Sequence, residues 1–357
     1  MAGQARRGGE RPRLAPLVIL SQAKEAKRTA MPRDSDTSLP RRDLLRNATL
    51  AAAALVLRAP LAACEREAPR EPETERLAAS PPTDPDQARL AAWTATLRTE
   101  GLSRPESPFG RSATRVGELA AGTPYEASTL EAYLRAGGSP SGTEPLALSL
   151  TRFDCVTLVE ACLAVARVAD GGGAPTWEGF GREVEKMRYR GGERGGYTSR
   201  LHYFSEWITD GSQRGLVKDL GEELGGVEDS RPLRFMTEHR DRYLALADDR
   251  VFQEIGAIER RLDGRQRRVI PTDRIRKVGD RIETGDVLAF ATAIPGLDVT
   301  HAALAYRDAE GILRVLHAPL SGGVVEVTRA TLPEYVAAIR RSTGILVARP
   351  ARGTTQG

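Results

Sequence analysis

One cysteine and two histidines are of the residue types that thiol-dependent acyl transfer requires. Cys155 follows Asp154 at the start of a segment with helical apolar spacing. Because Asp is a good helix N-cap, we expect Cys155 in the first turn, where the helix dipole and unpaired N–H groups favour the nucleophilic thiolate. His301 and His317 lie far downstream. The three side chains predict a nucleophile, a general base and a group that orients the base.

Strands must bring the two histidines together. Turn signals separate three β-rich runs, which lie around residues 286–292, 299–306 and 312–318. We expect these runs to form an antiparallel meander. His301 lies near the start of the second run and His317 near the end of the third. Those two ends are neighbours in consecutive antiparallel strands, so the imidazoles are predicted to meet.

The second cysteine of this region, Cys162, is expected to be a packed core thiol. Two helical turns place its Cα about 10 Å from that of Cys155, which is too far for a disulfide. The four histidines (residues 202, 239, 301 and 317) form no short-range chelating pair. We therefore expect neither a metal site nor a cofactor.

The first 64 residues have the features of an export leader. Arg41 and Arg42 precede an apolar stretch of about 11 residues, and the pair resembles a twin-arginine signal. The stretch ends at Leu61-Ala62-Ala63-Cys64, which resembles the lipobox of bacterial lipoproteins, where Cys64 would be acylated. An ordinary cleaved signal with an incidental cysteine is the alternative. The leader predicts an exported, periplasmic or cell-envelope lipoprotein that uses the twin-arginine route.

Charge separates this leader from the rest of the chain. Residues 1–63 carry a net charge of +7, so the remainder of the +4 chain has a net charge of −3. A slightly acidic remainder argues against binding to nucleic acid. Residues 65–87 are charged and Pro-rich and predict a disordered tether. We expect one folded domain over residues 88–350 and a flexible tail over 351–357.

Six short motifs follow one another within the expected domain. They are Gly122–Tyr125, Asp154–Thr157, Ser199–Phe204 with Trp207, Gly285-Asp286, Gly296–His301 and Leu316–Ala318. Together they resemble the NlpC-type, papain-like cysteine peptidases of bacterial cell walls, and most closely their N-acetylmuramoyl-L-alanine amidase-like branch. This resemblance implies an α+β fold with a papain-like core, in which the helix that carries Cys155 packs on an antiparallel sheet that carries both histidines.

The resemblance also implies roles for individual residues. Cys155 would be the nucleophile, His301 the general base and then acid, and His317 the orienting group. Tyr125 would contribute to the oxyanion site or to substrate binding, and Asp154 would face the substrate as well as cap the helix. The residues implied as pocket or wall residues are Arg200, His202 and Tyr203. The segment that holds these three also fits an amphipathic helix face.

The activity implied is hydrolysis of the amide between the lactyl group of N-acetylmuramic acid and L-alanine. The partner would be peptidoglycan or a muropeptide, the membrane would be met only through the lipid anchor, and the protein would be a monomer. Two alternatives stay open. The same residues could cut the stem peptide after γ-D-glutamate, or the domain could be a catalytically inactive wall-binding lipoprotein.

The other elements are expected from local patterns. The insertion between Trp207 and Glu283 should be mainly helical, for example over Val251–Leu262. A helix over Leu332–Arg340 should cover the sheet, and Ile345–Arg349 should return as a strand.

Overall fold

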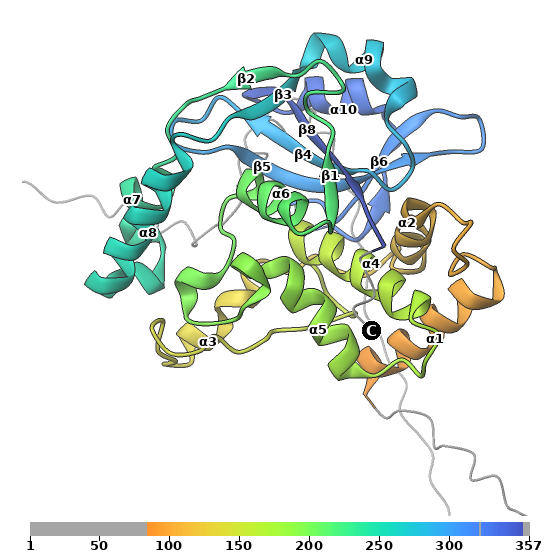
Figure 1. Ribbon diagram of the computed structural model, residues 1–357, viewed down its shortest axis with the longest axis horizontal. Helices are drawn as coiled ribbons and strands as arrows, with labels where there is room; N and C mark the ends of the chain where they lie inside the picture. The colour runs from red at the N-terminus through yellow and green to blue at the C-terminus, as the bar shows by residue number, and fades with distance from the viewer. Residues whose placement is uncertain (1–83, 321–322, 353–357) are drawn as a thin grey trace, which may run out of the picture. The chain divides into compact units, whose positions relative to one another are not determined.

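The computed structural model describes residues 84–320 and 323–352 and contains one antiparallel sheet with helices on both faces (Figure 1). The strands are β1 (Val217–Asp219), β2 (Val227–Asp229), β3 (Arg267–Pro271), β4 (Val287–Thr292), β5 (Val299–Arg307), β6 (Leu313–His317), β7 (Glu326–Val327) and β8 (Ser342–Pro350). Their order in the sheet is β2-β3-β8-β4-β5-β6-β7, and β1 pairs with β8 outside this path. The three runs predicted to form a meander are β4, β5 and β6, and their pairings are antiparallel.

The centre of the sheet is apolar on both faces. Every residue of β4 is buried, and its sequence VLAFAT shows no alternation of apolar and polar residues. Such a strand is stable only when both faces are covered. Val287 and Ala289 belong to the apolar cluster on one face of the sheet, and Leu288 and Phe290 to the cluster on the other.

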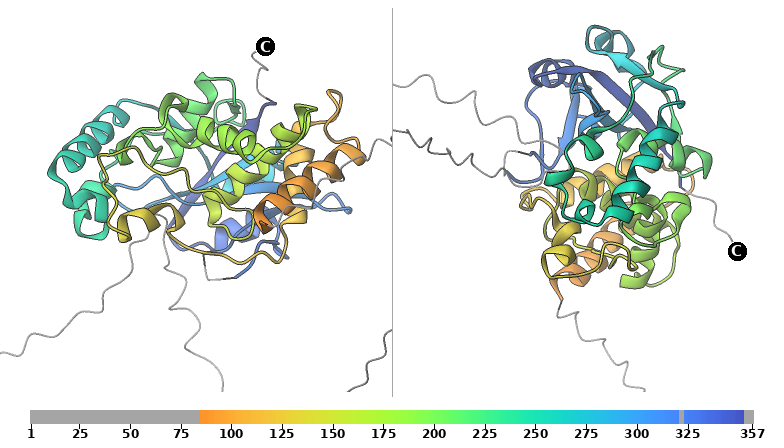
Figure 2. Two further views of the ribbon diagram at one scale, coloured as in Figure 1. Left: turned by 90° about the horizontal axis from the view of Figure 1, so that it is seen from below. Right: turned by 90° about the vertical axis from the view of Figure 1, so that its left-hand side faces the viewer.

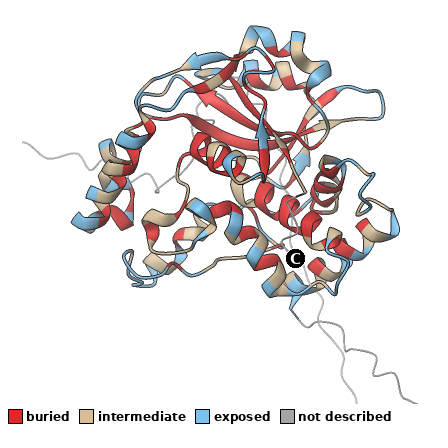
Figure 3. Cartoon of the chain, in the orientation of Figure 1, coloured by how far each residue is buried: buried red, intermediate tan, exposed pale blue. Residues whose placement is uncertain are grey.

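Helices supply the two covers. They are α1 (Pro85–Thr99), α2 (Phe109–Leu119), α3 (Ala132–Arg135), α4 (Cys155–Asp170), α5 (Trp177–Arg188), α6 (Phe204–Gln213), α7 (Phe235–Glu238), α8 (Asp249–Leu262), α9 (Ile275–Val278) and α10 (Leu332–Ala338). Helix α4 lies against one face at the centre of a group of helices, and most of its residues are buried (Figure 3). Helix α10 packs on the opposite face, and α7 and α8 lie together at one end of the molecule (Figure 2).

Most of the local predictions agree with these elements. The helix expected over Val251–Leu262 is within α8, the expected cover helix is α10, and the strand expected over Ile345–Arg349 is the central part of β8. The insertion between Trp207 and Glu283 is mainly helical, as expected. It also contains β1, β2 and β3, which extend the sheet by pairing with one another or with β8. Short strands of this kind gain their stability from the neighbouring strand, which the local sequence does not reveal.

The Gly285-Asp286 motif joins the start of β4 to α2 and to β8. Gly285 has a φ of 90°, and a Cβ at this position would lie 2.2 Å from the Cα of Gly110 in α2. The buried Asp286 carboxylate accepts hydrogen bonds from the Arg349 guanidinium at 2.8 and 2.9 Å. The motif therefore fixes the start of β4 against α2 and β8.

Helix α1 begins at Pro85, so residues 85–87 of the expected tether are helical. The predicted leader, its twin-arginine pair and Cys64 lie outside the described residues. Within the described part of the chain, no helix has the length and apolar character needed to cross a bilayer.

Candidate active site

The first turn of α4 carries Cys155, as predicted. Asp154 is the N-cap, and its Oδ1 accepts the backbone N–H groups of Val156 at 3.0 Å and Thr157 at 2.8 Å. Thr157 Oγ1 accepts the Asp154 N–H at 2.9 Å and completes a capping box. These reciprocal bonds fix the helix start, and with it the position of the Cys155 side chain.

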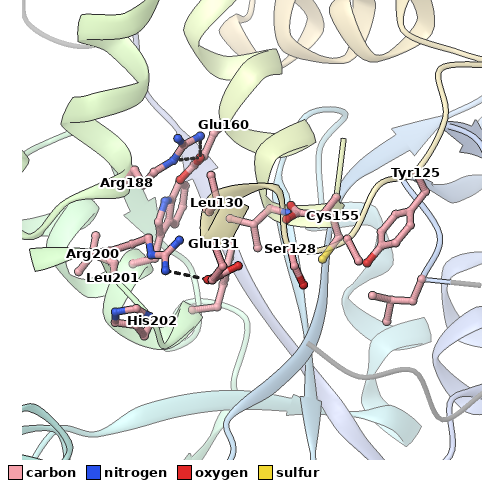
Figure 4. Close-up of a pocket in the computed structure, with 16 residues that line it drawn as sticks. Tyr125, Ser128, Leu130, Glu131, Cys155, Glu160, Arg188, Arg200, Leu201 and His202 are labelled. Atoms are coloured by element: carbon pink, nitrogen blue, oxygen red, sulfur yellow. Dashed lines mark hydrogen bonds and ion pairs between the residues drawn. The ribbon is translucent and has the colours of Figure 1, made fainter. Parts of the chain in front are cut away.

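Cys155 lies in the wall of a pocket that is open to solvent (Figure 4). The Tyr125 hydroxyl points toward the sulfur. Ser128, on the same segment as Tyr125, has a left-handed φ of 58°, and strained backbone of this kind is concentrated at functional sites. The other residues that line the pocket are Ala127, Leu130, Glu131, Asp154, Val156, Glu160, Arg188, Arg200, Leu201, His202, Phe204, Trp207 and Leu320.

Cys155 is buried, with 2% of the residue exposed. Burial raises its pKa to about 12, and the neighbouring Asp154 carboxylate acts in the same direction. The backbone N–H groups of Cys155, Val156 and Ala302 point toward the sulfur and oppose this shift without reversing it. The expectation of a resting thiolate is therefore wrong, because desolvation outweighs the helix N-terminus. In the free protein the Cys155 side chain is a neutral thiol.

The two histidines meet as predicted. His301 Nε2 lies 2.8 Å from His317 Nδ1, and the two rings are nearly perpendicular, at 76°. Both side chains are buried. The other nitrogens, His301 Nδ1 and His317 Nε2, have no hydrogen-bond partner among the described residues. One histidine thus orients the other and leaves a ring nitrogen of His301 unpaired.

A β-bulge lies at the histidine of β5. Ala289 pairs with Ala302 and Ala291 with Val299, so β5 has one more residue than β4 between these pairs. Bulges redirect side chains and are frequent beside active sites. The His301 ring stacks on Phe290 of β4, with centroids 5.5 Å apart and planes 16° apart.

Burial keeps both imidazoles neutral. It lowers the pKa of His317 to about 4 and lowers the pKa of His301 well below its usual value, with the neighbouring His317 adding to the second effect. A neutral imidazole can accept a proton, so the protonation state suits a general base. No hydrogen bond joins Cys155 to His301 in the described structure. The sulfur instead lies beside the N–H of Ala302, the residue that follows His301.

Buried ion pairs form the far wall of the pocket (Figure 4). Arg200 Nη2 donates to Glu131 Oε1 at 2.8 Å, and Arg188 Nη2 lies 2.7 Å from Glu160 Oε2. His202, which also lines the pocket, has its Nε2 2.8 Å from a backbone carbonyl, and burial lowers its pKa. Arg200 and His202 thus both line the pocket, the place that the resemblance implied for them. The carboxylates that pair with Arg200 and Arg188 carry no sequence signal, because single glutamates are common on any helix or loop.

Tyr203 is absent from the pocket lining. Its hydroxyl donates to Glu259 Oε1 at 2.6 Å, and its ring packs in the apolar cluster of α7 and α8. A different tyrosine, Tyr335 of α10, lies beside the histidine pair, with its hydroxyl oxygen 3.3 Å from His317 Nδ1. The sequence predicted α10 as a cover for the sheet and gave no sign that one of its side chains reaches a histidine.

The described residues contain no group of three His, Cys, Asp or Glu side chains that could hold a metal ion. Cys162 is fully buried in the core, as predicted.

Comparison with known proteins finds a matching family. A family model described as N-acetylmuramoyl-L-alanine amidase-like matches residues 115–345. A solved N-acetylmuramoyl-L-alanine amidase from Bacteroides uniformis is 30% identical, with 68% of this chain and 99% of that chain covered and a TM-score of 0.62. A proposed xylanase from Bacteroides fragilis is 33% identical, with 66% and 99% covered and a TM-score of 0.60.

A more distant structure comes from Legionella pneumophila. It is 18% identical, with 74% of this chain and 94% of that chain covered and a TM-score of 0.53, and it shows similarity of fold alone. No curated protein matches the sequence.

Proposed function

This chain belongs to the N-acetylmuramoyl-L-alanine amidase-like family, and we propose that it cleaves the amide between the lactyl group of N-acetylmuramic acid and L-alanine by a Cys-His-His mechanism. The observation that carries the mechanism is the unpaired Nδ1 of His301, whose ring is held by His317 through the other nitrogen. The Cys155 sulfur lies beside the backbone N–H of Ala302, the residue that follows His301. We also propose that α4 and the sheet form the papain-like core of the NlpC type.

The first half of the reaction forms a thioester. Cys155 Sγ attacks the lactyl carbonyl carbon while its proton moves to His301 Nδ1, which requires the two atoms to approach when substrate is bound. The negative charge that develops on the carbonyl oxygen is stabilised by the Cys155 N–H and by the Tyr125 hydroxyl. The imidazolium then donates its proton to the L-alanine nitrogen as the C–N bond breaks.

The second half uses the same base. His301 takes a proton from water, and the hydroxide attacks the thioester carbon. The C–S bond breaks, N-acetylmuramic acid leaves as its carboxylic acid, which loses its proton to water, and the proton on His301 returns to the sulfur. Because the resting thiol is neutral and buried, its proton must pass to His301 as the sulfur attacks.

Glycoside hydrolysis, which a xylanase performs, needs two carboxyl groups free to act as acid and as base or nucleophile. The pocket carboxylates Glu131 and Glu160 are bound to arginines, and Asp154 caps α4. The arrangement of the pocket thus favours amide cleavage by the thiol.

The location is proposed from the leader alone. We propose export by the twin-arginine route and acylation of Cys64, so that the domain lies in the periplasm or at the cell envelope within reach of peptidoglycan. We further propose that the domain acts as a monomer.

The deciding experiment is mass spectrometry of purified muropeptides, including crosslinked stems, after incubation with the protein. Free stem peptides that begin with L-alanine, together with peptide-free disaccharide, are the expected products. Disaccharide-dipeptides would move the cut to the bond after γ-D-glutamate. Absence of any product, with Cys155 unreactive toward iodoacetamide, would leave a wall-binding protein.

A further inference from the structure

The paired histidines have two ways to share their protons. In the first, His301 Nε2–H donates to His317 Nδ1, which leaves a lone pair on His301 Nδ1 and a proton on His317 Nε2. In the second, His317 Nδ1–H donates to His301 Nε2, and His301 Nδ1 carries a proton. Only the first arrangement lets His301 accept the proton of Cys155. The 2.8 Å contact between the two rings fits both arrangements, so another group near the pair must favour the first one.

The neighbours of His317 distinguish the two arrangements. The Tyr335 hydroxyl, 3.3 Å from Nδ1, can donate or accept and so fits either one. Nε2 lies 3.8 Å from Glu326 Oε1, a carboxylate oxygen. A carboxylate only accepts, so it attracts an N–H and repels a lone pair.

Glu326 is held at this place by the sheet. It is the residue of β7 that pairs directly with His317 of β6. Its side chain is 55% exposed and so remains in contact with water while it faces a buried imidazole. Cross-strand partners of this kind lie close enough to interact.

We propose that Glu326 is a positioning residue that sets the tautomer of the histidine pair, holding a proton on His317 Nε2 so that His301 Nδ1 is free to act as the base. The inference rests on the proposed role of His301. It adds a fourth member to the chain of groups behind the nucleophile, and its charge also stabilises the His301 imidazolium through His317.

The test needs no cell-wall substrate. In the full chain labelled with 15N, NMR of the imidazole nitrogens should show both histidines protonated at Nε2. Replacing Glu326 by leucine should yield a mixture of tautomers and slow alkylation of Cys155 by iodoacetamide about tenfold, because attack on that reagent also passes the thiol proton to His301. Glu326→Gln, which keeps an acceptor oxygen, should keep the tautomer and lose less of the rate.

Glu310→Leu is the matched control, since Glu310 is also exposed and lies on the distant turn between β5 and β6. It should change neither the tautomers nor the alkylation rate. A wild-type His317 protonated at Nδ1, or a Glu326→Leu variant with wild-type tautomers and rate, would overturn the proposal. Normal tautomers and alkylation with no muropeptide cleavage would overturn the proposed function and leave this inference standing.

Discussion

Asp298 links the strand of the candidate base to a helix of the pocket wall. Its Oδ2 accepts the backbone N–H of Ser205, in the first turn of α6, at 2.8 Å, and its Oδ1 accepts the N–H of Val299 at 2.7 Å. The same carboxylate thus caps α6, which carries the pocket residue Trp207, and fixes the start of β5, two residues before His301.

Replacing Asp298 by alanine should lower the free energy of unfolding by about 1–2 kcal/mol, because a helix cap and a strand-start hydrogen bond are lost together. The cleavage rate should fall as well, since His301 and the α6 wall are no longer held to each other. Urea unfolding and kcat/KM measure the two effects. Asp298→Asn, which keeps one acceptor oxygen, should recover part of both. Equal unfolding midpoints for the alanine variant and the wild type would show that this link is unimportant.

The two described cysteines provide a matched pair. Cys155→Ala should abolish turnover with little effect on folding, because the side chain lines a pocket. Cys162→Ala should remain active and lose about 1 kcal/mol of stability, because its sulfur is packed in the core. Product formation and thermal unfolding of both variants test this directly. Residual activity in the first variant at the level of the second would rule out the thiol mechanism.

The histidine pair predicts a loss of stability in acid. The folded-state pKa of His317 is about 4, below its unfolded value near 6.5, so the unfolded chain binds the proton first as the pH falls. The contribution of the neutral His317 imidazole to the free energy of unfolding is complete above pH 6.5 and is lost as the pH falls from 6.5 to 4. Thermal unfolding of wild type and His317→Gln should therefore show a steeper decline for the wild type in that window and parallel behaviour above pH 7.

His239→Gln, at the end of α7 and away from the pocket, serves as the control for this series. It should keep the wild-type slope between pH 6.5 and 4. A His317→Gln curve that follows the wild-type slope throughout that window would contradict the assignment of the proton uptake to the buried pair.

The buried ion pair of the pocket wall should contribute more to the free energy of unfolding than an exposed ion pair does. Arg200→Met leaves Glu131 and Glu144 buried without their guanidinium and should cost about 3–5 kcal/mol of stability. Arg250→Met breaks an exposed pair with Glu254 on α8 and should cost less than about 1 kcal/mol. Urea unfolding of the two variants compares them. Similar costs would mean that the wall of the pocket is more hydrated than its burial indicates.

Local patterns in the sequence were sufficient for the chemistry-bearing elements. Asp154 before Cys155 predicted the capped helix, and the β-rich runs predicted β4, β5 and β6 with the histidines at adjacent ends. These features depend on residues within a turn or on consecutive strands, where spacing along the chain nearly determines distance in space. The resemblance carried by the six motifs agrees with the family found by comparison.

Only the tertiary structure decided which other groups surround these residues. Tyr335 and Glu326 reach His317 from a later helix and a two-residue strand, and Tyr203 turns away from the pocket to Glu259. The ionisation of Cys155 was decided in the same way. A helix N-terminus favours the thiolate through short-range dipoles that the sequence reveals, whereas desolvation depends on everything packed around the sulfur, and here desolvation dominates.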